Sequence, residues 1–302
     1  MHAITHIIAT TDFSAAAERA VQRAALIAKQ LNAELHLMHV VHPLDLYTST
    51  ELSFGYQKHL GHMLQELSKD QLNTLAAKLQ KDFDISAQIA TRIGSAHTEI
   101  ASYAASKANC LIVAGARGES EKTLLNLLLG STATRLLRAT TCPVLIVRNV
   151  NDEPYQQVIA TVDFSSGSAE VPTLARIAAP EAHIELLHIF ELVQEAHMRR
   201  IGLDDARLHK YHNDALIEVG KNLDQILTGQ HDNRMTHTII TGYPAVAICA
   251  RATQLPADLI VIGRHGMSGF HEWLLGGVSK DVAQAATCDV LVVNQRHEVR
   301  EQ

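Results

Sequence analysis

The stretch from Gly263 to Ser279, GRHGMSGFHEWLLGGVS, has the residue types of an anion-binding loop. It follows the apolar run 259–262, which predicts a buried strand, and it leads into a helical pattern of apolar residues at Val278, Val282 and Ala286. Glycines where a strand hands over to a helix let backbone N–H groups approach an anion, and the helix N-terminus is electropositive. The stretch therefore predicts a site for a phosphate-bearing ligand.

The predicted pocket also needs the ends of neighbouring strands, because doubly wound sheets bind ligands at their carboxyl edge. Asp163 ends one apolar strand and Ile189 ends the next. We expect a purine and ribose beside these strand ends and phosphates on the glycine backbone, with charge from Arg264 and His265 and a hydroxyl donor from Ser279. The predicted nucleotide-binding residues are Thr161, Val162, Asp163, Ile189, Gly263, Arg264, Gly266, Gly276, Gly277, Val278 and Ser279.

The sequence contains an internal repeat. ATTDFS at 9–14 returns as ATVDFS at 160–165, and later segments return in the same order. A repeat of roughly 150 residues has the size of a domain rather than of a solenoid unit. We therefore expect two similar domains, residues 1–150 and 151–302.

The repeat places a second candidate site in the first half. LIVAG ending at Gly115 matches LIVIG ending at Gly263, and Asp12 matches Asp163. The residues of this second candidate site are Thr11, Asp12, Val40, Gly115, Gly118, Gly130, Ser131 and Thr132.

Apolar runs alternate with helical patterns along each half. The predicted strands are 4–10, 34–41, 85–93, 111–114 and 144–147, then 157–162, 183–189, 236–241, 259–262 and 290–293. The predicted helices are one after Ser14, then 51–81, 94–105, 131–139, 168–179, 195–228, 244–254 and 278–286. Such alternation implies right-handed crossovers. The predicted fold class is α/β, with two tandem domains that each form a five-stranded doubly wound parallel sheet flanked by helices.

Composition and charge limit where in the cell the protein is expected and which classes of partner it binds. The chain has 302 residues, of which 47% are apolar, and a net charge of −6, which disfavours binding to nucleic acid. No apolar run approaches a membrane span, and the N-terminal segment lacks the features of a signal peptide, so we expect a cytoplasmic protein without a membrane partner. The cysteines lie far apart without a CxxC pair, which predicts reduced, mostly buried thiols. They are Cys110, Cys142, Cys249 and Cys288.

The chain has 18 histidines, and HLGH at 59–62 matches HKYH at 209–212. A spacing of three puts each pair on one helical face, where a metal ion could be held. Exposed helix histidines are the commoner case and no third ligand is evident, so we expect no metal at these pairs. The four residues are His59, His62, His209 and His212. His39 and His188, on apolar strands, are expected to be hydrogen-bonded core residues.

Taken together, these motifs resemble a tandem member of the universal stress protein family. Nucleotide-binding members carry Gly, two residues, Gly, nine residues, then Gly followed by Ser or Thr, with an Asp at an early strand end. The resemblance rests on the DFS openings, the glycine loops and the CPVLIV ending at 142–147, and it covers both halves. It implies a Rossmann-type fold like that of the adenine nucleotide hydrolases, and ATP, alone or with Mg, as ligand. It also implies that strands 144–147 and 290–293 join the halves into a pseudo-dimer, and that two chains associate as a homodimer.

The two loops depart from the family pattern in different ways. The 266–276 loop has the nine intervening residues, but Gly277 stands where Ser or Thr is expected. The 118–130 loop has eleven intervening residues and carries Glu119 and Glu121, which would oppose a polyphosphate unless a cation intervened. We therefore favour the second half as the nucleotide site and treat the first as degenerate or altered in ligand.

The resemblance implies a stress-associated module that binds ATP in its second domain and whose nucleotide occupancy changes its shape or its affinity for a partner. The sequence has no GxxxxGK[ST], HExxH or GxSxG motif. Without a lysine or a magnesium carboxylate pair near the loop, hydrolysis should be slow. Two alternatives stay open, a slow ATPase and an interaction module that binds no nucleotide.

Overall fold

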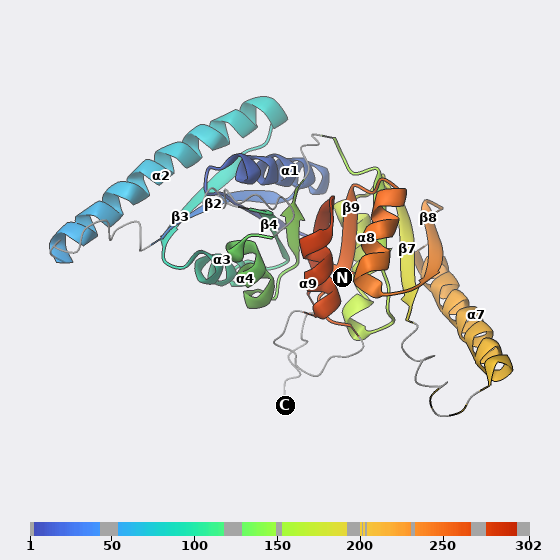
Figure 1. Ribbon diagram of the computed structural model, residues 1–302. Helices are drawn as coiled ribbons and strands as arrows, with labels where there is room; N and C mark the ends of the chain where they lie inside the picture. Colours follow the sequence, from blue (N-terminus) through green and yellow to red (C-terminus); the bar gives the residue numbers. More distant parts are fainter. Residues whose placement is uncertain are drawn as a thin grey trace, which may run out of the picture. The chain divides into compact units, whose positions relative to one another are not determined.

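The computed structural model contains two compact units whose boundary falls between Pro154 and Tyr155 (Figure 1). The residues that it describes are 3–42, 54–117, 129–148, 153–191, 200, 202, 204–230, 233–266 and 276–294. Among these residues, no helix combines the length and the apolar character that crossing a bilayer requires. Each unit is a parallel sheet flanked by helices, which confirms the predicted fold class.

The first unit has a five-stranded parallel sheet in the order β3-β2-β1-β4-β5. From β1 the chain adds β2 and β3 on one side, then returns to the other side for β4 and β5. The switch point between β1 and β4 lies at the carboxyl edge, where such sheets bind ligands. The elements are β1 (His6–Thr10), α1 (Ala15–Leu31), β2 (Glu34–Val41), α2 (Phe54–Phe83), β3 (Ala87–Ile93), α3 (Ala96–Ala105), β4 (Cys110–Gly115), α4 (Ser131–Ala139) and β5 (Val144–Val147).

Helix α1 shows how the sequence sets these layers. The Oγ of Ser14 accepts the N–H of Ala17 at 3.2 Å and caps the helix, as predicted, and Asn32 ends it in the left-handed conformation. Its buried face is rich in alanine, so the helix lies close to the strands. Figure 1 shows α1 and α2 on one face of the sheet and α3 and α4 on the other, so both faces are covered.

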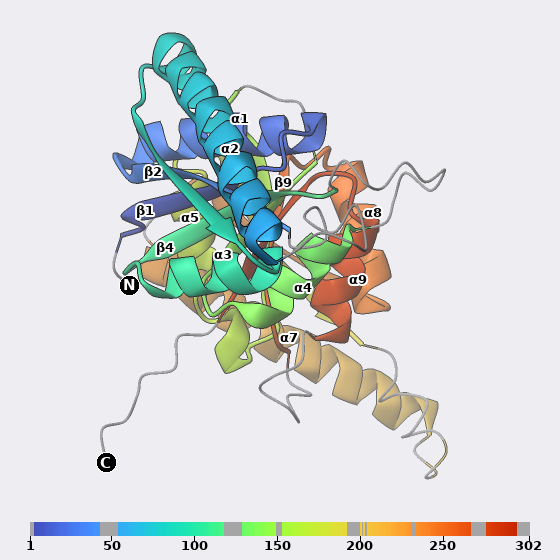
Figure 2. The same ribbon diagram turned by 90° about the vertical axis from the view of Figure 1, so that its left-hand side faces the viewer.

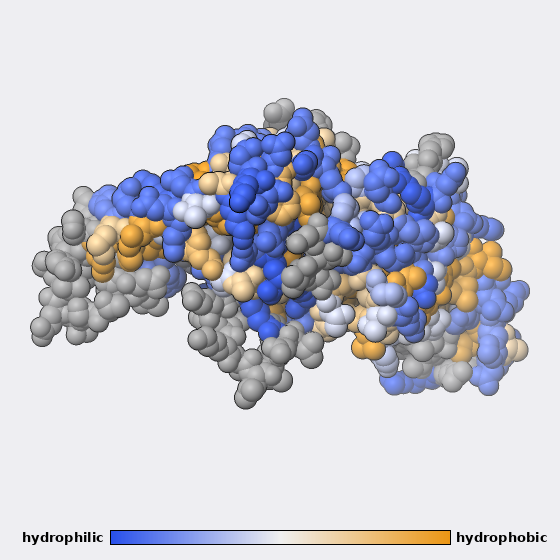
Figure 3. All heavy atoms as spheres, turned by 90° about the horizontal axis from the view of Figure 1, so that it is seen from above, coloured by the Kyte–Doolittle hydropathy of each residue, from blue (hydrophilic) through white to orange (hydrophobic). Residues whose placement is uncertain are grey.

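Helix α2 extends past the strands that it covers. Figure 2 shows it running diagonally past α1, which it contacts. The side chains of Met63 and Leu67 are 47% and 54% exposed, and Figure 3 shows apolar side chains on the projecting part of this helix. The apolar pattern that predicts the helix is therefore only partly buried within the unit.

The second unit repeats the architecture, with strand order β10-β9-β6-β7-β8, all parallel. Its switch point lies between β6 and β9, the counterparts of β1 and β4. The elements are β6 (Gln157–Thr161), η2 (Ser166–Ser168), α5 (Val171–Ala178), β7 (His183–Phe190), α7 (Asp205–Gln230), β8 (Met235–Thr241), α8 (Pro244–Gln254), β9 (Leu259–Gly263), α9 (Gly277–Ala285) and β10 (Asp289–Val293).

One helix of the second unit differs from the prediction at its start. The segment expected as a helix over 168–179 forms the short 3₁₀ turn η2 and then α5, whose first turn contains Pro172. In η2, Gly167 lies so close to the chain that an added Cβ would be 2.5 Å from the carbonyl oxygen of His265. Of the helix expected over 195–228, the structure describes α7 from Asp205 onward, and residues 192–199, 201 and 203 lie outside the described residues.

The expectation of four reduced cysteines is wrong for one pair. Cys110 and Cys142 form a disulfide with their Cα atoms 6.1 Å apart, a normal spacing for such a bond. Cys110 begins β4 and Cys142 precedes β5, and these strands are neighbours in the sheet. Strand pairing therefore joins two residues that are 32 positions apart. The other two cysteines, Cys249 and Cys288, form no disulfide, as predicted.

Candidate functional site

The glycine loop of the second unit is closed by one carbonyl group. The carbonyl oxygen of Arg264 accepts the N–H of Gly276 at 3.0 Å and lies 2.9 Å from the Oγ of Ser279, which donates to it. The N–H of Arg264 donates to Val293 at the end of β10. Both ends of the loop are therefore fixed to the sheet edge through the backbone of Arg264.

The first unit closes its loop in the same way. The N–H of Ala116 donates to Val147 at the end of β5, and the carbonyl of Ala116 accepts the N–H of Gly130 at 2.7 Å. The two additional residues of this loop therefore leave its anchor unchanged. The intervening segments, 118–128 with the predicted residue Gly118 and 267–275 in the second unit, lie outside the described residues.

Both loops end at the N-terminus of a helix that no side chain caps. Gly130 is the N-cap of α4 and Gly276 is the N-cap of α9, and neither position has a side-chain cap hydrogen bond. The first N–H groups of a helix have no partner within the helix, and the helix dipole adds positive potential there. These two ends are therefore suited to bind phosphate oxygens.

The strand-end aspartates lie beside these loops. The Oδ1 of Asp163 accepts the N–H of Ser165 at 3.0 Å, and its Oδ2 would be 2.8 Å from a Cβ added to Gly266. In the first unit the Oδ1 of Asp12 accepts the N–H of Ser14 at 3.1 Å. In α1 the helix cap is Ser14, so Asp12 shapes the turn before the helix instead of capping it.

A cavity of about 140 Å³ opens at the carboxyl edge of the first unit. Its lining brings together every residue of the first-half candidate site that the structure describes. Those residues are Thr11, Asp12, Val40, Gly115, Gly130, Ser131 and Thr132. A strand-end carboxylate and an uncapped helix N-terminus therefore share one hollow.

Several polar side chains predicted to bind the ligand of the second unit have partners within the protein. The Oγ1 of Thr161 donates to the carbonyl of Val261 at 3.3 Å. Ser279 is 2% exposed, and its Oγ donates to the loop backbone. Arg264 is 8% exposed, and burial lowers the pKa of its guanidinium. The hydroxyl of Ser279 therefore supports the loop, whereas that of Thr161 joins two neighbouring strands.

The other predicted residues of the second unit form the walls of the strand ends and the start of α9. Val162 is buried and its N–H donates to Leu187, whereas Ile189 is half-buried. Val278 is 37% exposed in the first turn of α9. Apolar side chains at strand ends and polar backbone at a helix start are the two kinds of group that suit a ligand with a flat apolar ring and an anionic tail.

Two phenylalanine–histidine pairs lie next to the strand-end aspartates, and these contacts were not predicted from the sequence. The ring of Phe164 lies 5.0 Å from that of His188, and Phe13 lies 4.7 Å from His39. Both phenylalanines have positive φ, 60° and 63°, which is uncommon for an aromatic residue and typical of functional turns. The repeated DFS triplet marked the two phenylalanines in the sequence. It could not show that each phenylalanine ring contacts a histidine on the neighbouring strand.

The histidines of these pairs are hydrogen-bonded, as predicted. The Nδ1 of His188 is 2.7 Å from the carbonyl oxygen of Val162, and that of His39 is 2.8 Å from the carbonyl oxygen of Thr11. Burial lowers the pKa of His188, an effect that exceeds the opposing ones of the Val162 carbonyl and of Asp163. The ring is therefore neutral at neutral pH and fixes the strand end.

The histidine pairs of the long helices are not brought to these sites. His62 and His209 are exposed on α2 and α7, and the side chain of His59 lies outside the described residues. The ring of His212 packs 4.9 Å from that of Phe190. The absence of a metal at these four positions stays a prediction.

Known proteins resemble both the sequence and the fold. The model of a family described as the universal stress protein family matches residues 3–148 and again 154–294. A universal stress protein of Mycolicibacterium smegmatis is 29% identical over 313 residues, which cover 96% of this chain and 97% of that protein. One of Mycobacterium tuberculosis is 28% identical over 313 residues, with 96% of each chain covered.

A solved structure extends the likeness to the fold. The crystal structure of a universal stress protein from Archaeoglobus fulgidus matches with a TM-score of 0.69, covering 96% of this chain and 98% of that chain. The sequence identity is 18%, so this likeness bears on the fold alone.

Proposed function

The chain belongs to the universal stress protein family, and from that premise we propose that it binds an adenine nucleotide at the carboxyl edge of its sheets. One observation carries the proposal: Asp12, Ser131 and Thr132 line one cavity at the uncapped N-terminus of α4. A carboxylate that can accept from ribose hydroxyls and the backbone N–H groups of a first helical turn, which can bind phosphate, meet the two polar requirements of a nucleotide.

A bound nucleotide would extend beyond this cavity. The cavity has a volume of about 140 Å³, whereas the smallest typical ligand pockets have a volume of roughly 300 Å³. The ribose and the first phosphate fit the described part, and the base would lie along the strand ends beside Val40. Further phosphates, with Mg where ATP is the ligand, would lie toward the 118–128 loop.

We propose one nucleotide per unit. The second unit has the loop spacing of nucleotide-binding family members, and its loop is anchored on Arg264 as the first is on Ala116. The first unit has the hydroxyl of Ser131 at the position where the second has Gly277. Nucleotide occupancy would then set the affinity of the protein for a partner, as expected of a stress-response module.

Calorimetric titration with ATP and Mg²⁺ tests the proposal through a matched pair of variants. Ser131→Asp and Gly277→Asp each place a carboxylate in the first turn of a helix, where it favours the helix but repels phosphate. No atom lies within 4 Å of a Cβ added to Gly277, so the new side chain fits. We expect two sites in the native protein, one site in each single variant and none in the double variant.

The outcomes separate the alternatives. A native protein that retains its circular dichroism but binds no ATP would be the nucleotide-free module. Binding that neither variant weakens would place the nucleotide elsewhere. Loss of all binding with Gly277→Asp alone would leave the second unit as the single site, as the loop spacing predicts.

A further inference from the structure

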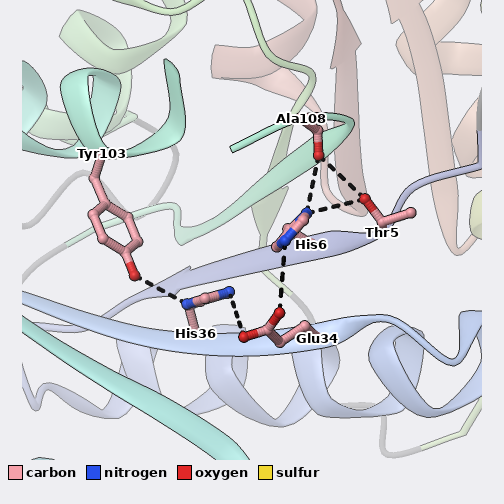
Figure 4. Close-up of polar contacts among 6 residues, drawn as sticks. All are labelled: Thr5, His6, Glu34, His36, Tyr103 and Ala108. Atoms are coloured by element: carbon pink, nitrogen blue, oxygen red, sulfur yellow. Dashed lines mark hydrogen bonds and ion pairs between the residues drawn. The ribbon is translucent and has the colours of Figure 1, made fainter. Parts of the chain in front are cut away.

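Three potential metal ligands meet at the amino end of the first sheet, far from the nucleotide edge. One ligand atom from each of His6, Glu34 and His36 lies within 4.8 Å of the others. His6 begins β1 and pairs in register with Glu34, which begins β2, and His36 follows two residues later on the same face. Figure 4 shows both imidazoles directed at the Glu34 carboxylate. Strand pairing alone therefore assembles the cluster.

The buried member has a ring nitrogen that no hydrogen bond satisfies. His36 is 0% exposed, and its Nε2 has no hydrogen-bond partner. This nitrogen faces the Oε1 of Glu34 at 3.5 Å. Buried polar atoms nearly always have a hydrogen-bond partner, so a buried nitrogen that faces a carboxylate without a hydrogen bond is suited to share a cation with it.

The Nδ1 atom of each ring, which points away from Glu34, already has a hydrogen-bond partner. The Nδ1 of His6 lies 3.0 Å from the carbonyl oxygen of Ala108. A carbonyl accepts only, so this Nδ1 carries the proton and the Nε2 of a neutral ring offers its lone pair toward the Oε2 of Glu34, 3.6 Å away. The Nδ1 of His36 lies 3.0 Å from the hydroxyl of Tyr103, which can accept from it. Metal-binding histidines have this outer support.

The second unit shows how the same position is stabilised without a metal. Glu185 on β7 occupies the place of His36, and Arg251 on α8 occupies the place of Tyr103. The two form a bidentate ion pair, at 2.8 and 2.5 Å, that neutralises the buried carboxylate. In the first unit the corresponding partner, Tyr103, engages one nitrogen of His36 and leaves the other facing the carboxylate.

We propose that His6, Glu34 and His36 bind one divalent transition-metal ion, best matched by Zn²⁺. The Nε2 of His36 lies 3.5 Å from the Oε1 of Glu34, and the Nε2 of His6 lies 3.6 Å from its Oε2. Each distance is close to the roughly 3.3 Å between ligands of a tetrahedral zinc ion with bonds of about 2.0 Å. Two imidazoles and one carboxylate suit zinc better than magnesium or calcium, which take oxygen ligands. Glu34 is 41% exposed, so a fourth position faces solvent and is open to water.

Two basic side chains lie near the cluster. Lys107 and Arg92 lie over the ring of Tyr103, at 5.7 and 5.5 Å from its centroid. These two cations would weaken the binding of a dication and set an upper limit on its affinity.

Cobalt substitution of the chelator-treated full-length protein tests the proposal. We expect one Co²⁺ per chain, with the visible absorption of tetrahedral nitrogen–oxygen coordination, and displacement of the cobalt by Zn²⁺. His6→Gln and Glu34→Gln change exposed or half-exposed ligands and should leave the fold intact, yet each should weaken binding by more than about 100-fold. Tyr103→Phe, which removes only outer support, should weaken binding about 10-fold.

Two matched variants complete the test. His183→Gln, at the position in β7 that corresponds to Glu34 in β2, should bind Co²⁺ as the native protein does. His62→Gln, on the exposed face of α2, should do the same. Absence of stoichiometric Co²⁺ binding by the native protein would overturn the proposal, and so would binding that survives both His6→Gln and Glu34→Gln.

Discussion

The glycines of the loop motif have different physical roles. An added Cβ would be 2.8 Å from the carbonyl oxygen of Gly167 at Gly263, and 2.8 Å from that of Arg264 at Gly276. Glycine is required at these two positions because another segment of backbone lies too close to leave room for a Cβ. This close approach would be needed with or without a ligand. Gly277 is different, since a Cβ there meets no atom within 4 Å. A hydroxyl-bearing residue would therefore fit at this position.

This difference leads to a prediction for Gly277→Ser. The new hydroxyl would stand where the first unit has Ser131 and could donate to phosphate, a hydrogen bond worth about 1 kcal/mol. Calorimetry should show ATP affinity in the second unit rising about fivefold. The reciprocal change, Ser131→Gly, should lower affinity in the first unit by a similar factor. A loss of affinity with Gly277→Ser would indicate that the phosphates do not reach this helix end.

At the scale of elements, helix α8 is attached to β7 by a buried ion pair. Burial alone would raise the pKa of Glu185, but the hydrogen bonds from Arg251 and Thr238, together with the charges of Arg251 and His183, outweigh it, so the pKa lies below its ordinary value. Arg251→Met would leave this carboxylate buried without its partner. We expect a loss of about 3 kcal/mol of unfolding free energy, measured in urea. Arg207→Met, which removes the exposed contact with Asp204, should cost less than about 1 kcal/mol.

The same pair predicts a pH dependence. Because the folded state lowers the pKa of Glu185, the stabilisation is complete above the ordinary value of 4.5 and is lost as the pH falls through the lower folded-state value. The difference in unfolding free energy between the native protein and Glu185→Gln should therefore shrink on acidification. A difference that stays constant or grows toward acid pH would contradict the assignment.

The elements could be predicted from sequence where local pattern decides them. Ser14 marked the start of α1, and the predicted bounds of α4 and β5 are those observed. The Cys110–Cys142 pair and the cluster of His6, Glu34 and His36 were missed, because each depends on the register between strands. Local spacing singled out the helix histidines instead, since a repeat of three or four residues is visible in one dimension and strand pairing is not.

At the scale of the whole molecule, the two units share one fold but differ in some of the polar residues that the fold positions. Both units have the same strand order, the same loop anchor and the same phenylalanine–histidine pair. They differ at the buried polar position of the second strand, His36 in one and Glu185 in the other, and at the first turn of the loop helix. We infer that the units differ in the metal that the first would bind, whereas each keeps a carboxyl edge at which a nucleotide is proposed to bind.

Hydrogen exchange can locate these responses separately. A metal held by His6, Glu34 and His36 fastens the amino ends of β1 and β2, whereas nucleotide would fasten the carboxyl edge. A ligand at 100 times its dissociation constant stabilises the unit that binds it by about 2.7 kcal/mol. With Zn²⁺ we therefore expect slower exchange in peptides of β1 and β2, and unchanged exchange in peptides of β6 and β7, which provide the internal control. Equal protection of both sets, or protection that persists in Glu34→Gln, would mean that zinc binds elsewhere on the chain.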